Sequence, residues 1–181
     1  MGNKREFEIA YVGLKQGLHV YNYNIADSFF ENYGQQDFVN CNTNIKLSID
    51  KNSGFMQLHF DIDGTVDVDC DRCGNTIRKQ LWDEFNIVVK LVENPEEMNS
   101  QEEDPDVYYI GKTENYLHIS DWIYEFVNLS VPMQKRCAED EKGNSLCNKE
   151  VVEKLQKMEE EIQKEANPLW SGLEKYKDLE N

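Results

Sequence analysis

Three long stretches of alternating apolar and polar residues dominate the middle of the chain. The first runs from Phe38 to Asp50, the second from Met56 to Val68 and the third from Ile77 to Leu91. Because successive side chains of a strand point to opposite faces, this period of two predicts strands with one buried and one exposed face. Only short turns separate the stretches, so we expect an antiparallel meander from about Phe38 to Val92.

Two helical patterns follow the predicted meander. Apolar residues recur at helical spacing from Ile119 to Leu129, and we expect this helix to pack on the sheet through Trp122 and Phe126. A second helix is predicted from Asn148 to about Glu165, with a narrow apolar stripe on an otherwise charged surface. The fold class is therefore α+β, an antiparallel sheet with a packed helix and a C-terminal helix.

Shorter patterns flank these elements. Alternation in residues 7–11 and 18–23, with a glycine-containing turn between them, predicts an N-terminal hairpin. Residues 26–33 predict a short helix, and residues 107–110 predict one more strand. The length of 181 residues suits a single domain. We divide residues 1–181 into the hairpin and short helix (1–35), the sheet core and helix (36–135), and a cysteine loop with the C-terminal helix (136–181).

Four of the five cysteines fall into two pairs. Cys70 and Cys73 lie where the second predicted strand turns into the third, and Cys137 and Cys147 lie far downstream. Structural zinc sites are commonly formed by four thiolates in two such pairs, so these cysteines predict a zinc site. However, nine residues separate the second pair, more than the usual two to four, and the alternative for the first pair is simple packing. The fifth, Cys41, falls on the apolar face of a predicted strand, which favours a packed thiol.

Charge limits the possible partners. The chain has 35 acidic and 19 basic residues, a formal net charge of −16. Such a field repels a bare polyanion, whereas a basic protein is electrostatically favoured as a partner. No apolar run approaches the length of a membrane span, and the N-terminus lacks the apolar core of a secretory signal. An odd number of cysteines without an export signal leads us to expect reduced thiols in the cytoplasm.

Two segments are candidates for contacting such a partner. Residues 93–106 are half acidic and contain no basic residue; they include Glu102, Glu103 and Asp104. This segment is either a solvated loop or a docking strip for a basic partner. Residues 169–173 form a second candidate, an apolar patch that contains Trp170. The alternative is that this patch covers the open face of the meander.

The sequence contains no recognisable catalytic constellation, so we expect no enzyme. Its three histidines, His19, His59 and His118, are isolated. Aspartates at positions 61, 63, 67 and 69 share one face of the second predicted strand. Paired carboxylates can do acid/base work or bind a hard cation, which makes a hydrolase a third possibility. In so acidic a chain, the interpretation we favour is a solvated strand face.

The order of these features resembles the bacterial YceD family. The resemblance rests on Cys70-Asp-Arg-Cys73 after a strand, Ile119-Ser-Asp near a helix, Leu129-Ser-Val-Pro132, and the distal cysteine pair. The closing segment, Asn167-Pro-Leu-Trp170 with Leu173, is also similar to the end of that family's pattern. Together these pieces cover roughly residues 40 to 180.

The resemblance implies a cytoplasmic bacterial protein needed for the accumulation of large-subunit ribosomal RNA. Many members carry four cysteines and are described as metal-binding, which by position would make Cys70, Cys73, Cys137 and Cys147 the ligands of a zinc ion. The widely spaced second pair departs from the pattern. Two functions remain open: a non-enzymatic assembly factor for the large ribosomal subunit, or a zinc-supported interaction module for another basic partner. In the first case the partner is the pre-ribosome or a basic large-subunit protein, with direct RNA contact left open.

Overall fold

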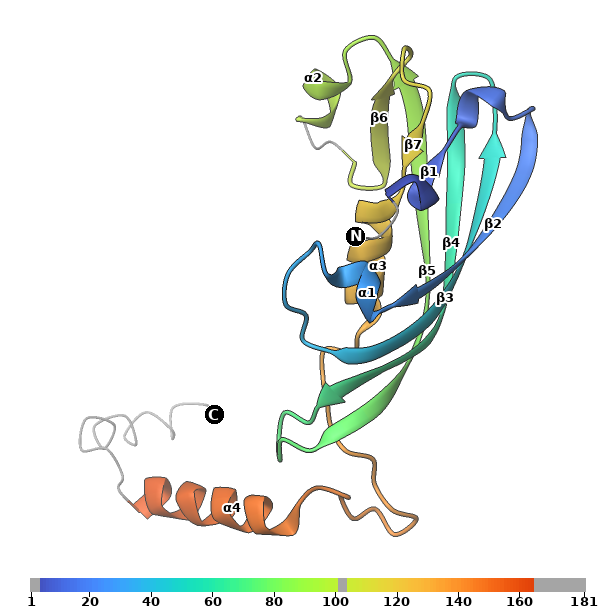
Figure 1. Cartoon of the computed structure of the whole chain (residues 1–181). Coiled ribbons are helices and arrows are strands. Elements are labelled where there is room, and N and C mark those ends of the chain that lie inside the picture. Colours follow the sequence, from blue (N-terminus) through green and yellow to red (C-terminus); the bar gives the residue numbers. More distant parts are fainter. Residues whose placement is uncertain (1–3, 101–103, 165–181) are drawn as a thin grey trace, which may run out of the picture. The chain divides into compact units, whose positions relative to one another are not determined.

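The computed structural model describes residues 4–100 and 104–164 (Figure 1). These residues form two compact units. One consists of the residues up to Val68 together with Arg78–Gln134, and the other of Asp69–Ile77 together with the residues from Lys135 onward. The first unit contains the sheet and its packed helix, and the second contains the two cysteine pairs and the C-terminal helix.

A five-stranded sheet forms the body of the first unit. Its strands lie in the order β2-β3-β4-β5-β6; they are β2 (Gly17–Ala26), β3 (Val39–Lys51), β4 (Phe55–Asp69), β5 (Thr76–Val92) and β6 (Val107–Gly111). β3 pairs antiparallel with both β2 and β4, and only a short turn joins β4 to β5. The predicted meander and the α+β class are confirmed. β6 is the predicted extra strand, and it pairs parallel to β5.

The core lies on the face of the sheet that helix α3 (Ser120–Ser130) covers (Figure 1). Side chains that alternate along β3 and β4, such as Leu47 and Phe60, are fully buried. Phe126 of α3 packs against the ring of Phe60 with centroids 5.1 Å apart and stacks on Phe85 at 4.3 Å. Trp122 also contacts Phe60, at 6.5 Å. The helix therefore packs through the two aromatic residues that its sequence predicts.

The N-terminal hairpin prediction is wrong. Residues 4–7 and 11–13 form 3₁₀ helices, and the two-residue strand β1 (Glu8–Ile9) pairs with β7 (Leu117–His118) instead of with β2. Tyr11 is buried here, and its hydroxyl donates a hydrogen bond of 2.6 Å to the backbone oxygen of Glu114. Contacts with residues more than 100 positions away thus determine the structure of this segment, and the short alternation of residues 7–11 does not. The predicted short helix is present as α1 (Asp27–Phe30).

Two irregularities shape the pairing of β3 with β4. The register shifts between Val39 and Asn42, and Asn40 there has a φ of 53°, with its backbone amide donating to the Asp27 carboxylate at 3.0 Å. Further along, the backbones approach so closely that a Cβ atom on Gly64 would lie 2.5 Å from the backbone oxygen of Asn42. Cys41 lies in β3 between Asn40 and Asn42. It is buried, as predicted, and burial raises the pKa of its thiol.

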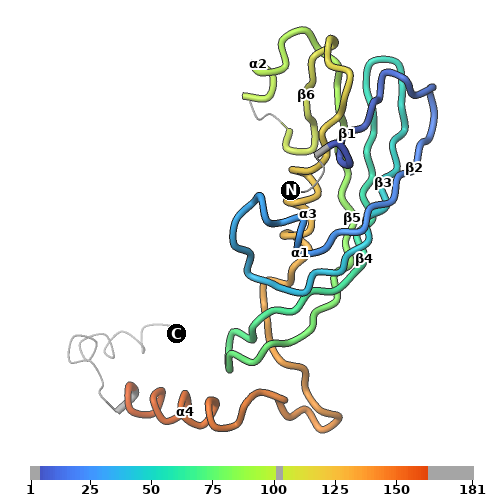
Figure 2. Tube along the Cα trace, viewed as in Figure 1, coloured from blue at the N-terminus to red at the C-terminus, as the bar shows by residue number. Residues whose placement is uncertain are grey.

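The acidic segment is partly helical, not only a loop. Helix α2 (Pro95–Asn99) follows β5 and lies beside β6 (Figure 2). The Asn99 side chain accepts a hydrogen bond from the Tyr109 amide and donates one to the Tyr109 oxygen, at 2.9 and 2.8 Å. Glu102 and Glu103 lie outside the described residues, as do residues 169–173 with Trp170. The predicted C-terminal helix is α4 (Lys149–Lys164). Among the described residues, no helix has the length and apolar character needed to cross a membrane.

Candidate metal centre

The first cysteine pair lies in the turn between β4 and β5. The Cys70 amide donates to the Asn75 oxygen at 2.8 Å, and the Gly74 amide donates back to the Cys70 oxygen at 2.9 Å. Gly74 has a φ of +72°, a conformation that glycine adopts without steric cost. The Cys-x-x-Cys-Gly sequence therefore closes a tight turn that holds both thiols on the same side.

The second pair is brought together by a small hairpin. Glu139 and Ser145 form an antiparallel bridge, and the amide of Leu146 donates to the Ala138 oxygen at 2.9 Å. At the tip, the Asp140 carboxylate accepts the amides of Lys142 and Asn144 at 2.9 and 2.8 Å. The nine residues between Cys137 and Cys147 thus fold back on themselves. The wide spacing that departs from the usual ligand pattern still places both cysteines at the base of one loop.

Two hydrogen bonds tie the turn to the segment that leads into this hairpin. The Asp71 amide donates to the Lys135 oxygen at 2.7 Å, and the Lys135 amide donates to the Asp71 carboxylate at 2.8 Å. The four sulfur atoms consequently lie within 4.8 Å of one another. The Sγ atoms of Cys70 and Cys147 are 3.9 Å apart, and those of Cys73 and Cys137 are 3.7 Å apart. The two pairs converge, as the sequence predicts for a shared site.

The two sulfur separations of 3.9 and 3.7 Å match those of a tetrahedral metal site. Four sulfurs at Zn–S distances of about 2.3 Å lie roughly 3.8 Å from one another, whereas a disulfide needs about 2.05 Å. All four cysteines are unpaired thiols, and Cys70, Cys73 and Cys147 are buried. Ile77, Val151 and Val152, which are partly buried, pack against the cluster. The donor set, the two measured sulfur separations and the apolar side chains packed around the cluster suit a closed structural zinc site. Metal binding itself stays a prediction.

The thiols share negative charge unevenly. Burial opposes ionisation of Cys70, but hydrogen bonds from backbone amides, including that of Arg72, outweigh it and lower its pKa to about 6. Backbone hydrogen bonding, led by Asn148, lowers the pKa of Cys73 as well. Burial and hydrogen bonds to the neighbouring sulfurs raise the pKa of Cys137 to about 12. Negative charge thus gathers on the first pair, and a divalent cation would allow all four thiols to ionise.

The aspartate row on the exposed face of β4 is distributed among separate partners. Asp67 accepts two hydrogen bonds from the Arg78 guanidinium, at 2.8 and 3.2 Å, and this contact lowers its pKa. Asp63 accepts from Gln80 at 3.2 Å, and Asp69 accepts from the Thr76 hydroxyl at 2.9 Å. Asp61 differs, because it contacts a histidine.

The fold and the cysteine cluster together describe an α+β protein whose four thiols come from a strand-to-strand turn and a downstream hairpin. A family model described as "Large ribosomal RNA subunit accumulation protein YceD" matches residues 58–177, which include all four cysteines. The match spans well over half of the chain, and the chain belongs to the YceD family. No curated protein and no solved structure gives a significant match.

Proposed function

We propose that this chain is a zinc-stabilised, non-enzymatic factor in the accumulation of large-subunit ribosomal RNA in the cytoplasm. The observation that carries the proposal is the convergence of four thiols, three of them buried, inside the region that matches the family model. In this role the ion is structural. Cys70, Cys73, Cys137 and Cys147 would hold it and fix the hairpin against the turn, because binding free energy at such a site stabilises the folded state.

The partner we propose is a basic protein of the large subunit or of its precursor. A net charge of −16 opposes capture of naked RNA, whose phosphates need lysine or arginine contacts. The same charge accelerates encounter with a basic surface. Asp104 is exposed beside β6, and its carboxylate accepts the Asp106 amide at 3.1 Å. It would steer the partner together with Glu102 and Glu103, while Trp170 would supply an apolar contact.

Depletion of the protein in its source cell tests the biological role. We expect less mature large subunit and less large-subunit ribosomal RNA on a sucrose gradient, with the small subunit retained. Wild-type protein should restore the profile, whereas Cys73→Ser should not. The matched control is Cys41→Ser, which removes a buried thiol outside the cluster. An unchanged gradient after depletion would overturn the ribosomal role and favour the alternative, an interaction module for another basic partner.

Binding measurements separate the two kinds of partner. The purified chain is mixed with naked ribosomal RNA and, separately, with basic large-subunit proteins at two salt concentrations. We expect salt-sensitive binding to a protein, weakened when Glu102→Gln, Glu103→Gln and Asp104→Asn are combined. Asparagine at position 104 keeps a hydrogen-bond acceptor for the Asp106 amide. Tight binding to RNA alone would contradict the proposed partner.

A charge-matched control distinguishes steering from net charge. Changing Glu159, Glu160 and Glu161 of α4 to glutamine removes the same three charges from another exposed surface. Equal weakening by both triple variants would show that only the total charge matters. If Trp170→Ala alone weakened binding, the apolar contact would be the recognition element and the acidic segment would have no part in it.

A further inference from the structure

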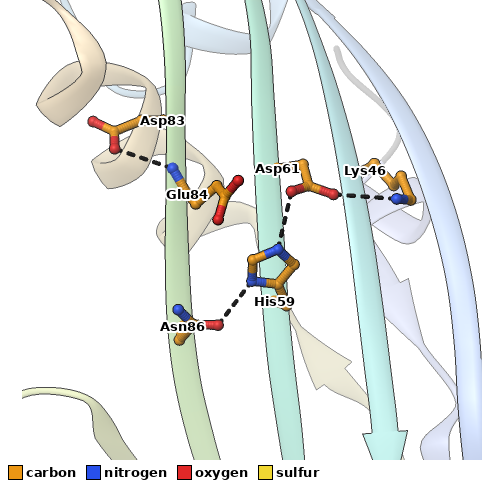
Figure 3. A network of polar contacts seen from close by, with 6 residues as sticks. All are labelled: Lys46, His59, Asp61, Asp83, Glu84 and Asn86. Atoms are coloured by element: carbon orange, nitrogen blue, oxygen red, sulfur yellow. Dashed lines mark hydrogen bonds and ion pairs between the residues drawn. The ribbon is translucent and has the colours of Figure 1, made fainter.

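A histidine and two carboxylates meet on the exposed face of the sheet, within the first unit, and none of the three belongs to the cysteine cluster. His59 and Asp61 lie two residues apart on β4, so their side chains project from the same face. Glu84 reaches them from the neighbouring strand β5. One ligand atom from each of the three residues lies within 4.8 Å of the other two. Figure 3 shows the three side chains turned toward one another, with Asp83 pointing away.

The hydrogen bond of His59 to Asn86 sets the direction of its free lone pair. Nδ1 of His59 lies 2.8 Å from Oδ1 of Asn86, and an amide oxygen can only accept, so Nδ1 carries the hydrogen (Figure 3). In the neutral ring Nε2 is then an acceptor. It lies 2.9 Å from Oδ1 of Asp61, which is also an acceptor. Two acceptors at this distance need a positive species between them.

The residues drawn around His59 in Figure 3 carry more negative than positive charge. The Glu84 carboxylate has no hydrogen-bond partner among the residues drawn in Figure 3, although it lies beside Asp61. Lys46 contributes one positive charge, but its Nζ lies 3.3 Å from Oδ2 of Asp61 and leaves Oδ1 free toward His59. Among the residues drawn in Figure 3, Lys46 is therefore the one lysine beside these two carboxylates.

We propose that His59, Asp61 and Glu84 form a second metal site, which takes a divalent transition ion such as Zn²⁺ through one imidazole nitrogen and two carboxylate oxygens. Asn86 is the outer partner that fixes the histidine tautomer, the role that carbonyl groups commonly have behind metal-bound histidines. Zinc ligands at 2.0–2.1 Å in tetrahedral geometry lie about 3.3 Å apart, so His59 and Asp61 need to separate by only about 0.4 Å. Three protein ligands leave a coordination position on the solvent side.

The alternative to a metal between Nε2 of His59 and Oδ1 of Asp61 is a proton. The hydrogen bond to Asn86, followed by Asp61, raises the pKa of His59, and an imidazolium would donate to both neighbours without any metal. An NMR experiment on the full-length protein separates the two. Histidine ring ¹⁵N signals are recorded at pH 7.5 while Zn²⁺ is added beyond one equivalent. We expect the Nε2 signal of His59 to move, with those of His19 and His118 unchanged.

His118 is a demanding internal control for this experiment. Its Nδ1 lies 3.8 Å from a carboxylate oxygen of Glu8, and it belongs to no three-ligand group among the described residues. Equal shifts of all three histidines would indicate loose surface association and overturn the proposal. So would a His59 signal that stays that of an imidazolium throughout the titration. Because the readout is local, the result does not depend on occupancy of the cysteine cluster.

Calorimetric titration of zinc into protein already holding one equivalent provides the second test. We expect one further equivalent, bound at least about tenfold more weakly by His59→Gln, Asp61→Asn or Glu84→Gln, and roughly 10–100-fold more weakly by Asn86→Ala. Asp63→Asn is the matched control, because it removes the same charge from the same face of β4. It should change affinity by less than about threefold, since a screened charge outside the ligand set contributes little. Equal losses in Asp61→Asn and Asp63→Asn would refute the site.

Discussion

Replacing Gly64 with alanine should weaken the pairing of β3 and β4. An added Cβ would lie 2.5 Å from both the Asn42 oxygen and the Thr43 Cα, and 2.8 Å from the Thr43 hydroxyl. Two of these three atoms belong to the backbone of β3, which is held between β2 and β4, so the neighbour cannot move aside cheaply. The new methyl group must instead separate the two strands locally or bend β4.

The magnitude follows from two opposing effects. Overpacking a tightly packed site costs typically 1–3 kcal/mol, and the backbone contacts place Gly64→Ala at the upper end. Alanine also restricts the unfolded chain, which stabilises the protein by about 0.4–1 kcal/mol. The free energy of unfolding should therefore fall by about 2 kcal/mol. For a chain of this length, that corresponds to a melting temperature about 4–8 °C lower.

Thermal unfolding followed by circular dichroism at a fixed zinc concentration measures this change. Gly13→Ala is the matched control, because a Cβ there has no atom within 4 Å and φ lies outside the left-handed region. Its melting temperature should stay the same or rise slightly. If Gly64→Ala melted at the same temperature as Gly13→Ala, the close approach of the two backbones would be refuted, together with the register of this strand pair.

Four further predictions concern the cluster, its loop and the core. Cys73→Ser should abolish tight binding of the first zinc equivalent in a chromogenic chelator assay, whereas Cys41→Ser should retain it, because only Cys73 belongs to the cluster. Asp140→Ala should weaken zinc binding by about tenfold, as expected for a supporting contact, while Glu141→Ala should not. Hydrogen bonds from Asn144 lower the pKa of Asp140 in the folded protein. The ionised Asp140 carboxylate therefore stabilises the fold above the unfolded pKa, and this stabilisation is lost as the pH falls through the folded pKa. The free energies of unfolding of wild type and Asp140→Asn should consequently become equal at low pH. Phe126→Leu should reduce the free energy of unfolding by about 1–2 kcal/mol in urea, because it removes ring contacts in the core; Trp82→Leu, at a side chain that is 78% exposed, should have almost no effect.

The meander and helix α3 were predictable because their signals are local and long. Alternation over more than ten residues specifies both a strand and its buried face, and Trp122 and Phe126 lie one turn apart on the same side of a helix. The N-terminal residues lacked such a signal. Three alternating positions from Phe7 to Tyr11 are too few to distinguish a long strand from the short strand and 3₁₀ helices that form there. Nothing in the local sequence indicates that this segment pairs with Leu117–His118.

Strand pairings and side-chain contacts that depend on register or on a crossover connection could not be predicted from the sequence. The parallel pairing of β6 with β5 requires the chain to return through α2, and a strand's own composition does not encode the direction of its neighbour. Similarly, His59 and Asp61 share a face by their spacing, but Glu84 joins them only through the alignment of β4 with β5. The spacing of Cys137 and Cys147 argued against a compact pair, and the turn residues Gly143 and Asn144 were the signal for the hairpin that brings them together.

The separation of the cysteine pairs along the chain has a consequence for the unfolded protein. Cys73 and Cys137 are 64 residues apart, and the chain between them contains β5, β6 and α3. An ion bound to both would act as a cross-link that lowers the conformational entropy of the denatured ensemble. If it resembles a disulfide that closes a loop of this size, it would raise the free energy of unfolding by about 4 kcal/mol. Elements that supply no ligand to the ion would then owe part of their resistance to unfolding to it. Chelation would lower the stability of α3 although α3 supplies no ligand to the ion.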